Sequence, residues 1–113
     1  MHQVVKSSRD VILRTDRWVE ASLFYESVLA FRVVHRSDTL MGFETGAFVL
    51  YVEKGANHGP GFEFLTSNVQ VEKRGLVAAG CALVEEDSTV PRCYLKDPFG
   101  LVFNLGTKDS GIT

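Results

Sequence analysis

The sequence has few of the features that mark specialised protein classes. Its 113 residues include two cysteines, three prolines and one tryptophan. Two cysteines are too few for the disulfide framework of a small secreted domain. No apolar run approaches the roughly 20 residues of a membrane-spanning helix, and the N-terminus has no apolar signal core. We therefore expect a soluble, cytoplasmic protein with no membrane partner.

The charge balance argues against a nucleic-acid partner. Twelve basic residues oppose 14 acidic ones, which gives a net charge of −2, whereas nucleic-acid-binding domains carry an excess of basic side chains. Hydrophobic residues make up 45% and charged residues 23%, as in ordinary globular domains. The length favours one domain over residues 1–113. Cys81 and Cys93 match no zinc motif, so we expect reduced, buried thiols, with a redox pair as the alternative.

The expected order of elements occurs twice. In the first half, a short apolar strand at 11–13 precedes a helix that Asp16 can cap, and three strands follow. The later strands are expected at 31–35, 39–44 and 47–53. The helix has a stripe at helical spacing, formed by Trp18, Ala21, Ser22, Tyr25 and Leu29 and widened by Phe24 and Val28.

The second half follows a glycine-rich connector at 55–61. A strand at 62–66 leads to a helix at 69–79, which begins at Ser67 or Asn68 and ends at Gly80. Three more strands are expected, at 82–84, 92–95 and 101–105. Asp97-Pro98-Phe99-Gly100 suits a type I turn between the last two.

This order predicts an α+β fold of two tandem βαβββ units, at about 9–54 and 61–107. A helix covers one face of each unit's sheet and leaves the other face bare. Pairing the units, within one chain or between two, would curl a mixed sheet around a cleft and leave the helices on the outer face. Strand alternation puts Tyr51, Glu63 and Asn104 on the bare side.

The same residues resemble a known superfamily. Val11-Ile12-Leu13 through Asp16 are followed by the helix Ala21–Phe31, which ends in Leu29-Ala30-Phe31 where the family commonly has Leu-Gly-Phe. The second half matches at Leu76–Gly80 and, most specifically, at Lys96–Leu105. The chain is similar in this way to the vicinal oxygen chelate superfamily, which includes glyoxalase I, extradiol dioxygenases and bleomycin-binding resistance proteins. The resemblance implies the fold above and a homodimer.

The resemblance also locates the family's metal ligands, which come from the first and fourth strands of each unit. The matching positions are Tyr51, Gly61, Asn104 and either Arg9 or Asp10. His, Glu or Gln is typical there, and neither tyrosine nor glycine suits a divalent ion. We therefore expect no metal and no cofactor, and we interpret the three histidines as surface residues. Glu53 or Glu63 could help to build a displaced metal site only if they converge.

The expected cleft retains groups that can bind a small molecule. Tyr51 and Trp18 can stack on a flat ligand, while Arg14, Glu63 and Asn104 can orient it. We therefore favour a metal-independent small-molecule binder similar to the resistance proteins. A lyase, isomerase or dioxygenase with an unconventional metal site is the alternative, and a scaffold with a collapsed cleft is the third possibility. The sequence does not identify the ligand.

Overall fold

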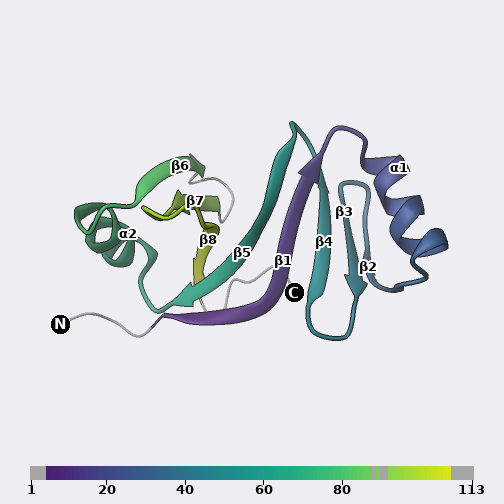
Figure 1. Cartoon of the computed structure of the whole chain (residues 1–113), viewed down its shortest axis with the longest axis horizontal. Coiled ribbons are helices and arrows are strands. Elements are labelled where there is room, and N and C mark those ends of the chain that lie inside the picture. Colours follow the sequence, from purple (N-terminus) through teal and green to yellow (C-terminus); the bar gives the residue numbers. More distant parts are fainter. Residues whose placement is uncertain (1–4, 88, 90–91, 108–113) are drawn as a thin grey trace. The chain divides into compact units, whose positions relative to one another are not determined.

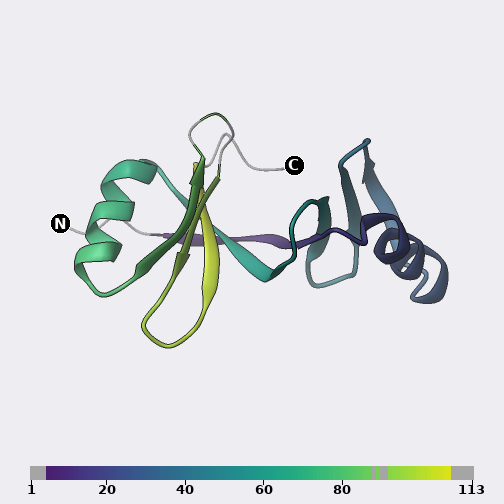
Figure 2. The same ribbon diagram turned by 90° about the horizontal axis from the view of Figure 1, so that it is seen from above.

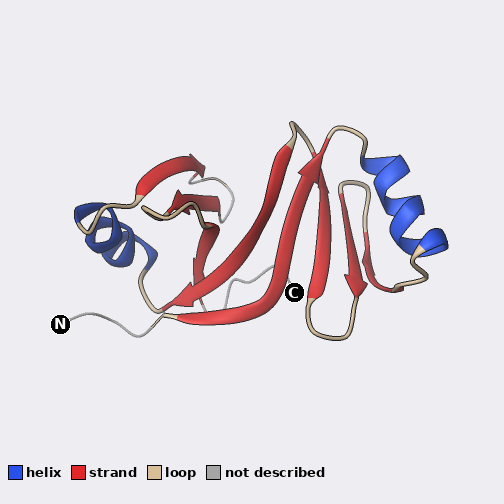
Figure 3. Ribbon diagram, in the orientation of Figure 1, coloured by secondary structure: helices blue, strands red, loops and turns tan. Residues whose placement is uncertain are grey.

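The chain folds into two βαβββ repeats, and the α+β class predicted from the sequence is confirmed (Figure 3). The computed structural model describes residues 5–87, 89 and 92–107. In chain order the elements are β1 (Lys6–Thr15), α1 (Trp18–Leu23), the π-helix η1 (Phe24–Val28), β2 (Arg32–Arg36), β3 (Leu40–Glu44), β4 (Val49–Lys54), β5 (His58–Thr66), α2 (Val69–Ala78), β6 (Ala82–Asp87), β7 (Arg92–Lys96) and β8 (Val102–Thr107).

The elements belong to two compact units. The first unit comprises residues 9–60, and the second comprises the described residues up to Ser8 together with those from Gly61 onward. The strand order is β2-β3-β4-β1 in the first unit and β5-β8-β7-β6 in the second. In each unit the first strand pairs in parallel with the fourth, and the other pairings are antiparallel. Both sheets are therefore mixed, as the sequence predicts.

In the first unit, α1 packs against one face of the sheet (Figure 1). The buried core under the helix consists of Met41, Phe43, Leu50 and Val52. Trp18, at the start of α1, lies on this core, and its indole Nε1–H donates a 2.7 Å hydrogen bond to the Val52 carbonyl. An indole that is both packed and hydrogen-bonded ties the helix to the central strand.

In the second unit, α2 covers the equivalent face (Figure 2). Cys93, Leu95, Phe103 and Leu105 form the buried core, and side chains of α2 pack on it. As predicted, Asn68 caps the helix by accepting a 3.1 Å hydrogen bond from the Val71 N–H. α2 has ten residues, and no helix in the described ranges is long and apolar enough to cross a membrane.

Two strands are longer than the sequence indicates. β1 covers Lys6–Thr15 rather than only 11–13, and β5 begins at His58, inside the predicted connector 55–61. Glycine and proline in the connector signal a turn, but the fixed φ of Pro60 also suits extended backbone. The connector is therefore shorter than predicted.

Asp16 does not cap the first helix, contrary to the prediction. α1 begins after Arg17, and among the described residues no side chain accepts a hydrogen bond as its cap. Asp16 instead donates its backbone N–H to Asn57 Oδ1 at 3.0 Å. The N–H of Arg17 reaches back to Thr15 Oγ1 at 3.0 Å. The strand-to-helix turn is thus held by groups outside the helix.

The apolar stripe predicted on this helix is only partly buried. The last turn winds as a π-helix, with the Leu29 N–H donating to the Phe24 carbonyl at 3.1 Å. The wider turn advances each side chain by a smaller angle than the 100° of an α-helix. As a result Phe24, Val28 and Leu29 are 48%, 66% and 46% exposed, and their predicted burial is wrong.

The residue after this helix is strained. Ala30 has φ = +58°, in the left-handed region, and it is the one described non-glycine residue with positive φ. A left-handed residue other than glycine costs about 1–2 kcal/mol. Ala30→Gly should therefore raise the free energy of unfolding by about 0.5–1 kcal/mol, after the larger entropy of glycine in the unfolded chain is deducted.

The matched control for this prediction is Ala79→Gly. Ala79 also follows a helix, but its φ of −86° is favourable for alanine, so glycine should destabilise the protein there by about 0.5–1 kcal/mol. Urea unfolding of the two variants should give shifts of opposite sign at an unchanged slope. Equal shifts in one direction would show that the strain at Ala30 is negligible.

Candidate functional site

The bare face of the first sheet, opposite α1, carries a row of four residues in register. Tyr51 pairs with Ile12 on one side and with Gly42 on the other, and Gly42 pairs with His35. Tyr51 is buried, and its ring lies over Gly42, where an added Cβ would be 2.8 Å from Tyr51 Cε1. The rings of His35 and Tyr51 are 6.3 Å apart between centroids. The row thus brings a phenol and an imidazole together on this side of the sheet.

His35 reaches this face because of a β-bulge, which the sequence analysis missed. The register of β2 against β3 skips one residue, Val34, between the pairs of Val33 and His35. Strict alternation would put His35 on the helix side with Val33, whose partner is the core residue Phe43. The extra residue in the bulge shifts the alternation by one, so that His35 lies on the face opposite the helix. No local pattern in the sequence predicts this bulge.

The bare face of the second sheet has an equivalent row with different chemistry. Glu63 pairs with Asn104, Asn104 pairs with Tyr94, and Tyr94 pairs with Glu85. A second bulge, at Val84, brings Glu85 to this side in the same way as His35 in the first unit. Tyr94 was also missed, although it alternates with the core residues on either side of it and so points away from α2.

Glu63 and Asn104, both predicted site residues, are in contact. Glu63 is 2% exposed, and Asn104 Nδ2 donates a 3.4 Å hydrogen bond to its Oε2. Asn104 Oδ1 in turn accepts the Cys93 N–H at 2.8 Å. The carboxylate lies over Gly106, where an added Cβ would be 3.2 Å from Oε2. A buried carboxylate held by an oriented amide is a polar group that can recognise a hydrogen-bond donor or a cation.

The structure decides between Arg9 and Asp10 as the first inward position of the first unit. Asp10 is buried and alternates with Ile12 on the bare face, two residues before the partner of Tyr51. Gly61 is likewise two residues before the partner of Asn104, so Asp10 and Gly61 are equivalent.

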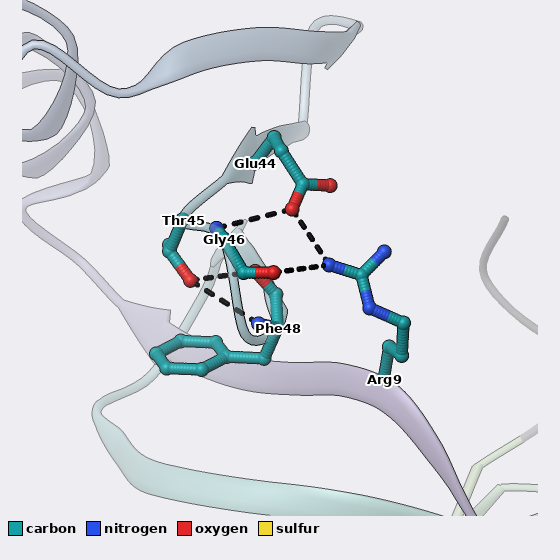
Figure 4. A network of polar contacts seen from close by, with 5 residues as sticks. All are labelled: Arg9, Glu44, Thr45, Gly46 and Phe48. Carbon is teal, nitrogen blue, oxygen red and sulfur yellow. Dashed lines mark hydrogen bonds and ion pairs between the residues drawn. The ribbon is translucent and has the colours of Figure 1, made fainter.

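Arg9 instead fastens the β3–β4 hairpin to β1 (Figure 4). Its Nη2 lies 2.6 Å from Glu44 Oε1 and 3.0 Å from the Gly46 carbonyl oxygen. The hydrogen bond to Arg9 holds the pKa of Glu44 below its usual value. The pair therefore stabilises the fold at pH values above the ordinary pKa of a glutamate, and this contribution is lost as the pH falls through the lowered pKa.

The residues at the four inward positions do not fit a divalent metal ion. Gly61 has no side chain, and the Tyr94 ring lies 3.2 Å from where its Cβ would be. Tyr51 presents a phenol, and the amide oxygen of Asn104 already accepts the Cys93 N–H. Asp10 is then the one carboxylate of the set, although such ions need several oxygen or nitrogen donors. Among the described residues, His, Cys, Asp and Glu form no group of three that could hold a metal.

The other predicted site residues lie elsewhere in the first unit. Arg14 is on the bare face, where its Nε pairs with Glu53 Oε1 at 3.2 Å, and it borders a groove of about 380 Å³ with Arg17 and His58. Trp18 lies on the opposite, helix side of the sheet with its indole bonded to the core strand. The structure therefore separates Trp18 from Tyr51 and Arg14 and gives it a packing role.

The two thiols are free, and both lie at the helix-side core of the second unit. Burial raises the pKa of Cys93 and, together with the nearby Asp97 charge, that of Cys81. Protonated thiols are poor nucleophiles. Cys93 is buried as predicted, whereas Cys81 is only partly buried.

Comparison with solved structures identifies the fold. The chain aligns with a glyoxalase/bleomycin resistance protein/dioxygenase superfamily member from Vibrio splendidus 12B01 at 16% identity and a TM-score of 0.60, covering 94% of this chain and 99% of that one. A hypothetical protein from Bacillus halodurans C-125 aligns at 9% identity and a TM-score of 0.67, covering 98% and 99%. A variant of homoprotocatechuate 2,3-dioxygenase from B. fuscum aligns at 16% identity and a TM-score of 0.62, covering 94% of this chain and 33% of that one.

The sequence comparisons are negative, since neither a protein-family model nor a curated protein sequence matches the chain. Identities of 9–16% are informative about the backbone but not about the chemistry. The repeated βαβββ order and the mixed sheets agree with the solved structures. The chain therefore has the vicinal oxygen chelate fold.

Proposed function

We propose that this protein binds a small organic molecule on the bare faces of its sheets and does so without a metal ion. What supports the proposal is that the positions where the resemblance expects metal ligands hold side chains suited to stacking and hydrogen bonding. Tyr51 and Tyr94 lie over glycines, and Glu63 forms a buried polar pair with Asn104. Aromatic surface with a few oriented polar groups is typical of ligand sites.

The chemistry of these groups suggests the class of ligand. Glu63 supplies carboxyl oxygens and Asn104 supplies an amide, so a ligand with a hydrogen-bond donor or a positive charge is favoured on the second unit. Tyr51 and His35 favour a flat ring on the first unit. Sequestration without reaction is the proposed role.

A screen of small molecules by thermal shift, followed by calorimetric titration of the hits, tests this function. Glu63→Gln and Tyr51→Ala should each weaken binding at least about tenfold, which corresponds to about 1.4 kcal/mol. Glu20→Gln is the matched control, because Glu20 is an exposed residue of α1 that pairs with Arg17, the residue before the helix. Affinities unchanged in both site variants would refute the proposed binding face.

Elemental analysis of protein purified without chelators or a metal-affinity tag tests the metal independence. We expect far less than one divalent ion per chain after dialysis. About one ion per chain would contradict the proposal and favour the enzyme alternative, a lyase, isomerase or dioxygenase with a displaced metal site. Asp10, Glu53, Glu63 and Asn104 would then be the first candidate ligands.

We further propose a homodimer in the cytoplasm. Four exposed apolar side chains on the outer side of the first helix support self-association: Val19, Leu23, Phe24 and Val28. Two free thiols suit a reducing compartment. Light scattering on the same preparations should give the mass of two chains, and the mass of one chain would contradict the dimer.

A further inference from the structure

The helix side of the second unit contains a groove that the proposed function does not use. It has a volume of about 480 Å³, in the range of small-molecule sites. It opens where the end of α2, the start of β1 and the β7–β8 turn meet. Its lining consists of Val5, Ser7, Phe64, Leu76, Cys81, Asp97 and Phe103.

The groove lies where the two repeats fill their helix–sheet layers with side chains of different size. In the first unit the large side chains of Trp18, Tyr25 and Phe31 pack on the core. In the second unit α2 offers the smaller Val69 and Leu76 to the same face. Protein interiors are normally close-packed, so smaller side chains under the helix leave space for another molecule.

One wall of the groove is a pair of aromatic rings. Phe64 and Phe103 have centroids 4.8 Å apart and planes inclined by 31°. Phe103 is buried in the core, which holds its ring in place. Leu76 of α2 and the protonated thiol of Cys81 complete an apolar lining. Such a surface suits a flat aromatic molecule.

The rim carries a single fixed negative charge. Asp97 is the one carboxylate side chain among the lining residues, and its Oδ1 accepts hydrogen bonds from the N–H groups of Phe99 and Leu101, both at 2.9 Å. The turn packs closely on the end of α2, where an added Cβ on Gly80 would be 3.2 Å from Pro98 Cγ. The carboxylate is therefore held in position before any ligand arrives.

We propose that this groove is a second binding site, which takes flat aromatic amines and rejects aromatic anions. The rings of the ligand stack along Phe64 and Phe103 beside Leu76, and its N–H group faces Asp97. An anionic group at the same place would meet the carboxylate at short range. The site is independent of Glu63 and Tyr51, which lie on the bare faces.

Two fluorescent probes that differ by one sulfonate test the selectivity. N-phenyl-1-naphthylamine is a neutral arylamine, and 8-anilinonaphthalene-1-sulfonate is its anionic relative. We expect the neutral probe to bind with enhanced fluorescence and at least about tenfold more tightly than the anionic one. Equal affinities, or no binding of the neutral probe, would overturn the proposal.

Two variants on neighbouring positions of α2 locate the bound probe. Leu76→Phe should fill the groove and reduce binding of the neutral probe at least about tenfold. Val77→Phe is the matched control, because Val77 is exposed on the same helix and does not line the groove. If both variants or neither lost binding, the probe would occupy another site. Circular dichroism confirms that both are folded.

Asp97→Asn tests the charge without removing the turn, because the amide oxygen can still accept both N–H bonds. The anionic probe should then approach the affinity of the neutral one, and an unchanged preference would contradict the role of Asp97. In the unmodified protein the neutral probe should also slow the alkylation of Cys81, measured by mass spectrometry. Cys81 is the more accessible of the two thiols, because Cys93 is buried. Unaltered alkylation would refute the site even if Leu76→Phe failed to fold. Glu63→Gln should leave probe binding unchanged, because Glu63 does not line the groove.

Discussion

Trp18→Ala should lower the free energy of unfolding by about 3 kcal/mol, since truncation of a large core aromatic side chain typically costs about 3–5 kcal/mol and Trp18 is only partly buried. The ring covers the core formed by β3 and β4, and its N–H bonds to the Val52 carbonyl at 2.7 Å. The substitution therefore opens a cavity and leaves a carbonyl without its donor. Because Trp18 is the chain's single tryptophan, unfolding in urea should be followed by circular dichroism rather than by tryptophan fluorescence.

Two further variants make this expectation specific. Trp18→Phe keeps a ring in place but loses the N–H, so its cost should fall to about 1–2 kcal/mol. Leu23→Ala removes an apolar side chain of the same helix that is 57% exposed, and such surface changes typically cost no more than about 0.5 kcal/mol. Equal costs for Trp18→Ala and Leu23→Ala would show that Trp18 does not contribute to the core. That result would restore its interpretation as a ligand-binding residue.

Asn104→Asp should destabilise the protein by about 3–5 kcal/mol at pH 8, the usual cost of leaving a buried charge uncompensated. The introduced carboxylate can still accept the Cys93 N–H, but it replaces the amide that donates to Glu63 at 3.4 Å. Two carboxylates at this distance repel each other in a buried site. The change in unfolding free energy relative to the unmodified protein is the quantity to measure.

The pH dependence gives this prediction a definite sign. Repulsion raises the pKa of the carboxyl pair in the folded variant above that in its unfolded chain. The folded state then binds a proton more readily, so the destabilisation should shrink as the pH falls from 8 to 5. Adding Glu63→Gln to Asn104→Asp removes one charge and should recover most of the loss. An equal loss at both pH values would mean that Glu63 and the new carboxylate do not interact.

Several elements follow from local sequence because the interactions that define them are local. The Asn68 cap of α2 is made within one helical turn. The turn from Asp97 to Gly100 closes through a 3.2 Å bond from the Gly100 N–H to the Asp97 carbonyl, as predicted. Alternation along a regular strand likewise placed Phe103 and Leu105 on the helix side and Asn104 opposite them.

Other features depend on groups distant in sequence, and no local pattern contains them. The turn before α1 is held by Asn57, 41 residues after Asp16, so no local pattern favours this contact over a cap by Asp16. The bulges at Val34 and Val84 exist only in relation to the partner strands. They decide that His35 and Glu85 share a face with Tyr51 and Tyr94, respectively.

By itself the amino-acid sequence determined the α+β class, the repeated unit and the side of the sheet, opposite the helix, on which Tyr51, Glu63 and Asn104 lie. These depend on residue identity and on a two-residue period, which a linear chain displays directly. Tertiary structure alone decided that Glu63 contacts Asn104, that Asp10 rather than Arg9 lies on the face opposite α1 and that Trp18 packs on the core of the first sheet. It also decided where the second helix leaves a groove, because packing depends on the volumes of side chains that meet only after folding.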